Sequence, residues 1–474
     1  MATEGTSDDQ RSALPIYFAI IMVSYTATAG ITTVYSMLKM LYASFDEPMK
    51  IGWVVTGYWL VASACSAICG RIGDIVGRRR MAILMLAIAG IGSLLSALAP
   101  TLTLVIIGCA LQGTTGTLTP LTIGLVREAV AREKVPFAVG IITAAGNVGT
   151  GISFMAAGWI VDRFSWQGGF TMKVVLVVLA IAALLKLVPP PRQKPGRIPR
   201  EGLFQGLLFA PAIAGVFISF QLANAWGWQD LRPWSVIAGS LLVLLYWGWD
   251  QSHRSHPLID VRSLGRREIL LANLSVGLLA MGCMQNGQAM SLFLQQPQWT
   301  GTGFGLSAFQ AGIVLLAVGS VSLVASPWGG ALGNRHGARA VGSAGAVLVL
   351  IGWMAITLHH PSLWFVLLAD VLMMVGLSVL QTVSYNTVVA ATPPDRTSEA
   401  TGMTYVFLNT SIAIGGQIMF LLMATSTVHD PAQGSGTFPA DAAYFKAFAY
   451  ISTIALLGLI VASLLPGRQA DKLH

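Results

Sequence analysis

The sequence predicts an all-α integral membrane protein with two six-helix lobes and two extra helices between them. The 474 residues are 54% hydrophobic and 10% charged, with a mean hydropathy of +0.69, which leaves too little polar surface to cover a soluble globule. A short stretch rich in glycine and arginine, Gly70–Arg80, lies between two long apolar runs and returns in weaker form at Gly330–Arg339. Two copies between apolar hairpins indicate an internally duplicated chain.

The two copies of this stretch align residue by residue. Glycine occupies the first, fourth and eighth positions, Asp or Asn the fifth, and arginine the tenth. Glycines let two helix ends and a tight turn approach a neighbouring helix, and arginines suit a headgroup surface. We interpret both copies as gating loops; the alternative is a plain basic anchor, which would not need the glycines. The gating candidates are Gly70, Asp74, Gly77, Arg78, Arg79, Gly330, Gly333, Asn334, Arg335, Gly337 and Arg339.

The net charge of +8 is distributed as a topology signal. Of the 28 lysines and arginines, all but six lie in alternate loops, in the tails or at their edges, which is the positive-inside pattern. The six exceptions are Lys39, Lys50, Arg163, Lys173, Arg232 and Lys446. The pattern argues against nucleic acid as a partner and makes the lipid bilayer the expected environment.

The spans of the first lobe follow in order. Residues 1–13 form a polar, acidic tail without the basic start of a signal peptide, so we expect them in the cytoplasm. Each apolar run is close to the roughly 20 residues that a bilayer requires. The spans lie near 14–38, 51–69, 81–99, 102–126, 136–160 and 170–188, and a proline-rich, basic run to residue 200 closes the lobe.

The second half repeats this plan after two extra spans, near 203–225 and 233–249, and a basic linker at 251–267. Its spans lie near 269–294, 308–329, 341–358, 363–391, 400–424 and 446–465. The predicted domains are a tail (1–13), an N-terminal lobe (14–190), the linkers with the extra helices (191–267), a C-terminal lobe (268–466) and a tail (467–474). The even number of spans predicts both termini on the cytoplasmic side of a bacterial inner membrane.

The chain resembles the major facilitator superfamily. The stretch at Gly70–Arg80 is similar to that family's loop between helices two and three, and three further segments resemble its fourteen-helix drug:proton antiporter branch: Trp53–Leu60, Ser165-Trp166 with Phe170, and Gly305–Gly312. The resemblance implies a major-facilitator-type fold with two rocking lobes. It also implies that helices one, four, nine and twelve line a central cavity.

Those four helices carry polar residues at helical spacing. The substrate-binding candidates are Ser24, Thr28, Thr32 and Tyr35 on helix one, Gln112, Thr115 and Thr119 on helix four, Gln285 and Gln288 on helix nine, and Gln381 and Tyr385 on helix twelve. Asn286 stands somewhat off the helix-nine face. The alternative is that serines and threonines bond to their own backbone or join helices.

Asp370 is the carboxylate well inside a predicted span. An acid there is costly unless it faces water, a partner or a substrate, and burial favours its uncharged form. This suits a residue that takes up and releases a proton, so Asp370 is the proton-coupling candidate; a structural pairing with a lysine or a helix end is the alternative. For Lys173 we expect a side chain that extends to the headgroups, with an anionic-substrate role as the alternative.

The chain also departs from the family pattern. The branch commonly carries an aspartate in helix one, where Ser24–Thr28 stand here. Its fourth-helix arginine is replaced by Cys109, and the Gly-Pro of its fifth helix by Ser153-Phe154. These departures weaken the expectation of proton exchange but leave the fold unaffected.

An enzyme is not expected, because no metal-spaced histidines, phosphate loop or nucleophile motif appears. The four cysteines, Cys65, Cys69, Cys109 and Cys283, sit in apolar runs as packing residues, and no metal or cofactor is predicted.

The sequence thus predicts a secondary active transporter that exports a small amphipathic compound, a drug or metabolite, by alternating access in exchange for protons. A facilitator or importer of a metabolite is the first alternative. A non-transporting membrane sensor or scaffold is the second. The oligomeric state stays open, with a monomer as the working expectation.

Overall fold

A computed structural model describes most of the chain. The described residues are 5–45, 47–119, 121–122, 125, 135–189, 211–253 except 213, 217, 220–221, 224–225 and 228, then 266–360, 362–390, 397–429 and 437–465. Within them, ten helical spans are long and apolar enough to cross a membrane. The prediction of an all-α membrane protein is confirmed.

The N-terminal half contains five labelled helices. They are α1 (Gly5–Ser44), α2 (Pro48–Val76), α3 (Arg78–Ala97), α4 (Leu102–Gln112), which continues as the 3-10 helix η1 (Gly113–Thr117), and α6 (Val135–Leu187). Helix α6 contains both the fifth and the sixth expected spans, joined by a kink at Ser165 (φ 61°, ψ −176°). That backbone region is costly for any residue but glycine, so the kink is held by its surroundings.

The C-terminal half contains the remaining spans. They are α9 (Arg267–Met281), η4 (Cys283–Gln285), α10 (Asn286–Gln295), η5 (Gln298–Thr300), α11 (Ala308–Ser320), α12 (Ser322–His336), α13 (Ala338–Leu358), α14 (Leu363–Ala390), α15 (Thr397–Ala424) and α16 (Asp441–Ser463). A small antiparallel hairpin of β1 (Thr427–His429) and β2 (Thr437–Pro439), which the sequence did not suggest, lies before α16. Every expected span except 203–225, which falls largely outside the described residues, coincides with a helix.

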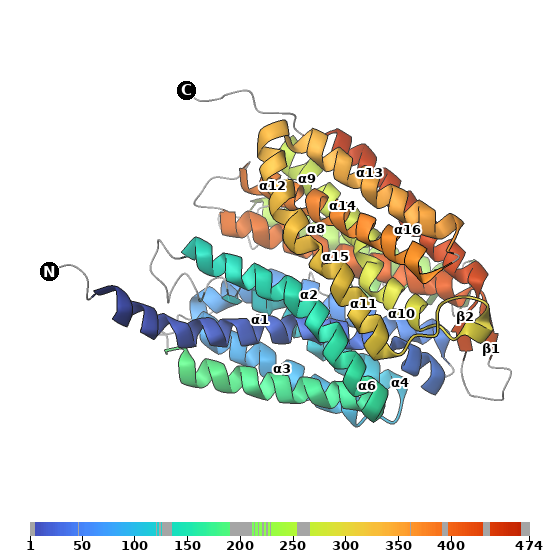
Figure 1. Ribbon diagram of the computed structural model, residues 1–474, viewed down its shortest axis with the longest axis horizontal. Helices are drawn as coiled ribbons and strands as arrows, with labels where there is room; N and C mark the ends of the chain where they lie inside the picture. The colour runs from blue at the N-terminus through green and yellow to red at the C-terminus, as the bar shows by residue number, and fades with distance from the viewer. Residues whose placement is uncertain are drawn as a thin grey trace.

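The two halves lie side by side in Figure 1, with α1 to α6 in one body and α9 to α16 in the other. Their contact surfaces are α2 against α15, α6 against α11, and α1 against α10. Glycines make the second contact close: a Cβ on Gly312 of α11 would lie 2.6 Å from the Phe154 carbonyl oxygen of α6. The lobe interface is therefore packed at backbone distance.

The duplicated glycine stretch has the same geometry in both halves. A single glycine separates α2 from α3 and α12 from α13: Gly77 has φ 107° and Gly337 has φ 89°. Each donates its backbone N–H to the glycine four residues earlier, Gly73 or Gly333, at 2.9 Å. Only glycine adopts such φ values readily, which explains why both copies keep it at this position.

The extra helix α8 (Leu231–His253) lies against both halves. Its Trp247 is buried with Trp53 of α2 and with Val406 and Ala413 of α15. Its opposite side exposes Leu241, Leu242, Leu245, Tyr246 and Trp249, as expected for a lipid-facing surface.

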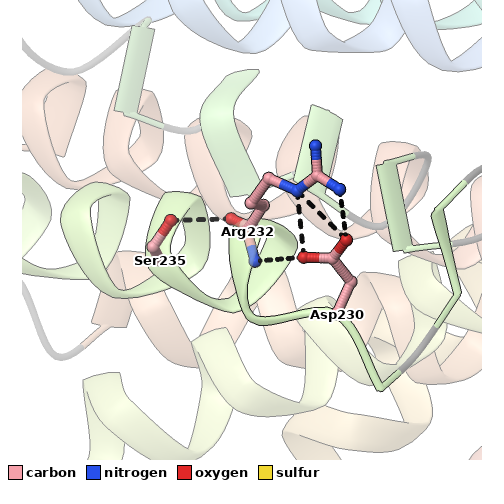
Figure 2. Close-up of polar contacts among 3 residues, drawn as sticks. All are labelled: Asp230, Arg232 and Ser235. Carbon is pink, nitrogen blue, oxygen red and sulfur yellow. Dashed lines mark hydrogen bonds and ion pairs between the residues drawn. The ribbon is translucent and has the colours of Figure 1, made fainter.

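The start of α8 is held by Asp230 (Figure 2). Its carboxylate accepts hydrogen bonds from the Arg232 backbone N–H at 2.9 Å and from the Arg232 guanidinium at 2.7 to 3.1 Å. The guanidinium hydrogen bonds hold the pKa of Asp230 below its ordinary value. This carboxylate therefore stays charged where the helix begins, which complements the helix dipole.

Candidate functional site

The ninth expected span is broken near its centre. Helix α9 ends at Met281, the backbone angles of Gly282 are distorted from those of an ideal helix (φ −110°, ψ −76°), and the 3-10 turn η4 leads into α10 at Asn286. Gly282 packs against α16, where its Cβ would lie 2.7 Å from the Ile454 side chain. Because the chain turns here, residues 285–288 point in directions that a straight helix would not give them.

Asp370 lies opposite this break. It sits on α14, about two turns after the helix begins, and is fully buried. Its Oδ1 accepts a hydrogen bond of 2.8 Å from Nδ2 of Asn286, while its Oδ2 has no hydrogen-bond partner among the described residues. The alternative of a pairing with a lysine is not what the structure shows, because the recorded partner is a neutral amide.

Gln285 and Gln288 flank Asn286 in the sequence and face α15. Gln285 donates to the carbonyls of Ala280 at 2.8 Å and Ile412 at 3.1 Å, and Gln288 donates to the Gln285 carbonyl oxygen. Both glutamines are buried, and the Gln288 carbonyl oxygen lacks a partner in the described part of the chain. Gln285 is thus locked between α9 and α15, whereas Gln288 retains a free acceptor.

Tyr35 marks the place where α1 meets the other lobe. Its hydroxyl accepts a hydrogen bond of 3.0 Å from the Trp59 indole, its ring stacks on Phe154 at 6.2 Å, and its carbonyl accepts a 2.9 Å bond from Ser291 of α10. The predicted contact residue therefore also joins the lobes. The rest of the helix-one set is more ordinary: Thr28 and Thr32 bond to the carbonyl four residues earlier, and the buried Ser24 hydroxyl has no described partner.

The helix-four candidates face the inside of their own lobe. Gln112 donates to Ser96 at 3.2 Å, and Thr115 bonds to the Tyr58 hydroxyl at 2.8 Å. Both line a small cavity together with Lys173. Thr119 is half-buried and its carbonyl accepts from Thr122. The structure thus places Gln112 and Thr115 in a different lobe from Asp370 and Asn286.

The helix-twelve candidates Gln381 and Tyr385 interact with each other through their side chains. The Tyr385 ring also stacks on Tyr405 of α15 at 6.2 Å. Both residues are half-buried, so they keep some accessible surface. They lie about three to four turns beyond Asp370 on the same helix.

The arginines at the tenth position of the two glycine stretches do something the sequence did not suggest. Arg79 donates to the carbonyls of Leu184 at 3.0 Å and Leu185 at 2.8 Å, at the end of α6. Arg339 donates to the Leu465 carbonyl at 3.0 Å, just after α16. Each binds the last helix of its own lobe and satisfies carbonyl groups at the end of that helix.

The structure describes contacts for only some of the other gating candidates. Gly333 packs against Val383 of α14, and Gly330 against Thr382. Asn334 and Arg335 are exposed, while Arg78 is half-buried and has a partner. The side chain of Asp74 and the surroundings of Gly70 lie outside what the structure describes.

The sequence matches a known protein family over most of its length. The model for the Major Facilitator Superfamily matches residues 17–415 and 277–473. The chain belongs to the major facilitator superfamily. It is accordingly a multi-pass membrane transporter and not an enzyme.

Several relatives carry names that refer to drug resistance. The lincomycin resistance protein of Streptomyces lincolnensis is 25% identical over 67% of this chain, and the chain spans only 64% of that protein's length. LmrB, a lincomycin resistance protein of Listeria monocytogenes, is 23% identical over 92% of both chains. Among solved structures, a POT family transporter in complex with 5-aminolevulinic acid has a TM-score of 0.65 at 15% identity, over 94% of each chain. The last likeness shows the fold.

The structure gives three residues of this superfamily transporter contacts that the sequence did not predict. Asn286 was set aside as off the helix face because the break at Gly282 is invisible to a helical count. Asp162 of α6 accepts the backbone N–H groups of Ala308 at 3.0 Å and Phe309 at 2.9 Å, so it joins the lobes at the start of α11. The signal for this contact was the Ser307-x-x-Gln310 capping box, which begins that helix.

Lys173 is the third, and the expectation for it was wrong. Only 4% of its surface is exposed, so it does not extend to the headgroups. The residue interacts electrostatically with Cys109, the position where the antiporter branch carries an arginine. In this transporter, helix six thus supplies a positive charge near the place where helix four lacks one.

Proposed function

We propose that this transporter exports a small amphipathic organic compound by alternating access, in exchange for protons. The observation that carries the proposal is Asp370: a fully buried carboxyl with one oxygen held by Asn286 and the other without a described partner. A charged carboxylate in such a place is costly, so the free energy of the protein differs strongly between the protonated and the deprotonated form of Asp370. A proton at Asp370 can therefore be linked to the balance between two states of the lobes.

The substrate contacts proposed are Tyr35, Gln288, Gln381 and Tyr385. The first bridges α1 and α10, the second has a buried acceptor without a described partner, and the other two are half-buried on the same helix as Asp370. Aromatic and amide side chains in an apolar setting suit an amphipathic ligand. The relatives named for drug resistance support export as the direction.

The proposed orientation places both termini and the two glycine stretches in the cytoplasm of a bacterium. The Asp162 contact then lies at the outer end of the lobe interface, because α6 turns at Ser165, three residues later. In this proposed orientation, the Asp162 contact and the Tyr35 to Ser291 bond join the lobes on the outer side.

Uptake into inside-out vesicles tests the proposal. Cationic, neutral and anionic amphipathic compounds would be supplied with and without a protonophore, to the parent and to Asp370→Asn. We expect uptake of at least one class to collapse both in the protonophore and in the variant. Asp230→Asn is the matched control, because it removes a carboxylate bound at the start of α8, and it should transport normally.

Two other outcomes would decide against proton exchange. Uptake that ignores both the protonophore and Asp370→Asn would indicate the facilitator or importer, which the absence of an acid at Ser24–Thr28 favours. Binding of a compound without any stimulated flux would indicate a sensor or scaffold.

A further inference from the structure

The cavity lined by Lys173 lies inside the N-terminal lobe. It is small and is lined by residues of α1, α3, α4, η1 and α6. The polar side chains around it are Thr26, Ser93, Gln112, Thr115 and Lys173. It is distinct from the surroundings of Asp370, which belong to the other lobe.

Lys173 enters this cavity without a compensating group. Only 4% of the residue is exposed, and its Nζ has no hydrogen-bond partner among the described residues. The Phe170 ring, whose centroid lies 5.2 Å from Nζ, offers only a weak cation-π attraction. A buried ammonium needs an opposite charge or full hydrogen bonding, and this one has neither in the described part of the chain.

The described surroundings supply no negative charge. None of the described residues that line the cavity is acidic. The ionisable neighbour that interacts with Lys173 is the Cys109 thiol of α4. The hydroxyls are already engaged: Thr26 donates to Met22 at 2.7 Å, Ser93 to Ala89 at 2.9 Å, and Thr115 bonds to Gln112 and Tyr58. A bound anion in the cavity can supply the missing charge.

Gln112 provides a second polar group for that ligand. Its amide nitrogen donates to Ser96 Oγ at 3.2 Å, and its carbonyl oxygen has no partner within the described residues. A hydroxyl can donate as well as accept, so the amide can turn over, accept the Ser96 proton in place of the Val105 carbonyl at 3.4 Å, and direct its NH₂ group into the cavity. Lys173 and Gln112 would then donate to the same bound group from two helices.

We propose that the Lys173 cavity is an anion-binding site, in which the ammonium and the Gln112 amide hold a single compact negative group. That group is either a free inorganic anion of about chloride size or the carboxylate of a small organic acid. The site is independent of the proton role of Asp370, because it lies in the other lobe and needs no transport to be occupied.

Thermal unfolding of the purified full chain tests the site. The protein would be placed in sodium gluconate, whose anion is too large for the cavity, and titrated with chloride, bromide or nitrate, and separately with formate or acetate. We expect a saturable rise in Tm of roughly 2–4 °C with the small anions. Saturation by the carboxylates alone would identify an organic acid as the ligand, and saturation by the halides would identify a free anion.

Variants assign the effect to the cavity. Lys173→Met keeps the length of the side chain without its charge and should lose the anion-dependent rise, whereas Lys173→Arg should keep it. Lys50→Met, at an exposed lysine, is the matched control for general salt effects. Gln112→Glu places a carboxylate beside Lys173, so it should raise the Tm in gluconate and make it independent of added anion, which keeps the test decisive if Lys173→Met fails to fold.

The same titration on Asp370→Asn separates the two proposals. The anion-dependent rise should persist there even if transport is lost. A Tm that is equal in gluconate and in every small anion, or a rise that Lys173→Met retains, would overturn the anion site.

Discussion

The two lobes of this transporter share the same close helix contacts, which we call the shared frame, but they bury different charged side chains. In each, one glycine turns the chain between the second and third helices, and an arginine two residues later binds the end of the lobe's last helix. In each, the third and fourth helices also cross at glycines, Gly92 with Gly108 and Gly345 with Gly376. Both lobes have glycine at these positions because a larger side chain would clash with the facing backbone.

The buried charges differ completely. The N-terminal lobe holds a cation, Lys173, beside an amide and a thiol, and the C-terminal lobe holds an acid, Asp370, beside an amide. Neither lies near a described opposite charge. The comparison teaches that the two lobes share their helix contacts, while each buries an ionisable group of its own.

The largest effect should come from breaking the shared frame. Gly108→Leu or Gly376→Leu forces a side chain into a facing backbone; a Cβ on Gly108 would already lie 2.6 Å from the Gly92 carbonyl oxygen. We expect each to lower the free energy of unfolding by about 3 kcal/mol or more, measured by thermal unfolding. Gly248→Leu, where nothing lies within 4 Å of the added Cβ, should change little. Tolerance at either crossing would show that the frame is not shared.

The second prediction concerns the acid of the C-terminal lobe. Asn286→Ala removes the hydrogen bond to Asp370, which should lower proton-driven uptake about tenfold, since an unmade buried hydrogen bond costs about 1–3 kcal/mol. The double variant with Asp370→Asn should be no worse than Asp370→Asn alone. Additive losses would mean that Asn286 acts elsewhere.

The third prediction concerns the contact between the lobes. Asp162→Ala removes a carboxylate that accepts two backbone N–H groups of α11. We expect a shift of about 1–2 kcal/mol toward states in which the two helices separate there. Spin labels at the exposed positions Phe164 and Ile313 would report a longer distance population in the variant. An unchanged distance distribution would remove Asp162 from the gate.

The smallest effect separates the two helix-end arginines. Arg79 donates to two carbonyls and Arg339 to one, so Arg79→Lys should cost about 1 kcal/mol of stability and Arg339→Lys about half as much. Thermal unfolding of both variants, with the exposed Arg335→Lys as the control, measures the difference. Equal losses would show that the second carbonyl contributes nothing.

Much of the fold was accessible from the sequence because it depends on local chemistry. Apolar runs of bilayer length gave the helices, and the repeated glycine positions gave the duplication, since a one-residue turn at positive φ admits little else. Asp370 was also recognised, because an acid in an apolar span stands out whatever surrounds it.

Tertiary structure decided the rest. A straight helical count could not place Asn286 against Asp370, because the break at Gly282 turns the chain. Nor could it bury Lys173, since a lysine near a helix end extends to lipid or into a lobe according to which helices surround it. The sequence also could not show that Arg79 and Arg339 bind the ends of α6 and α16, because those helix ends are far away in the chain. A sequence specifies what each residue can bind, and packing specifies what is within its reach.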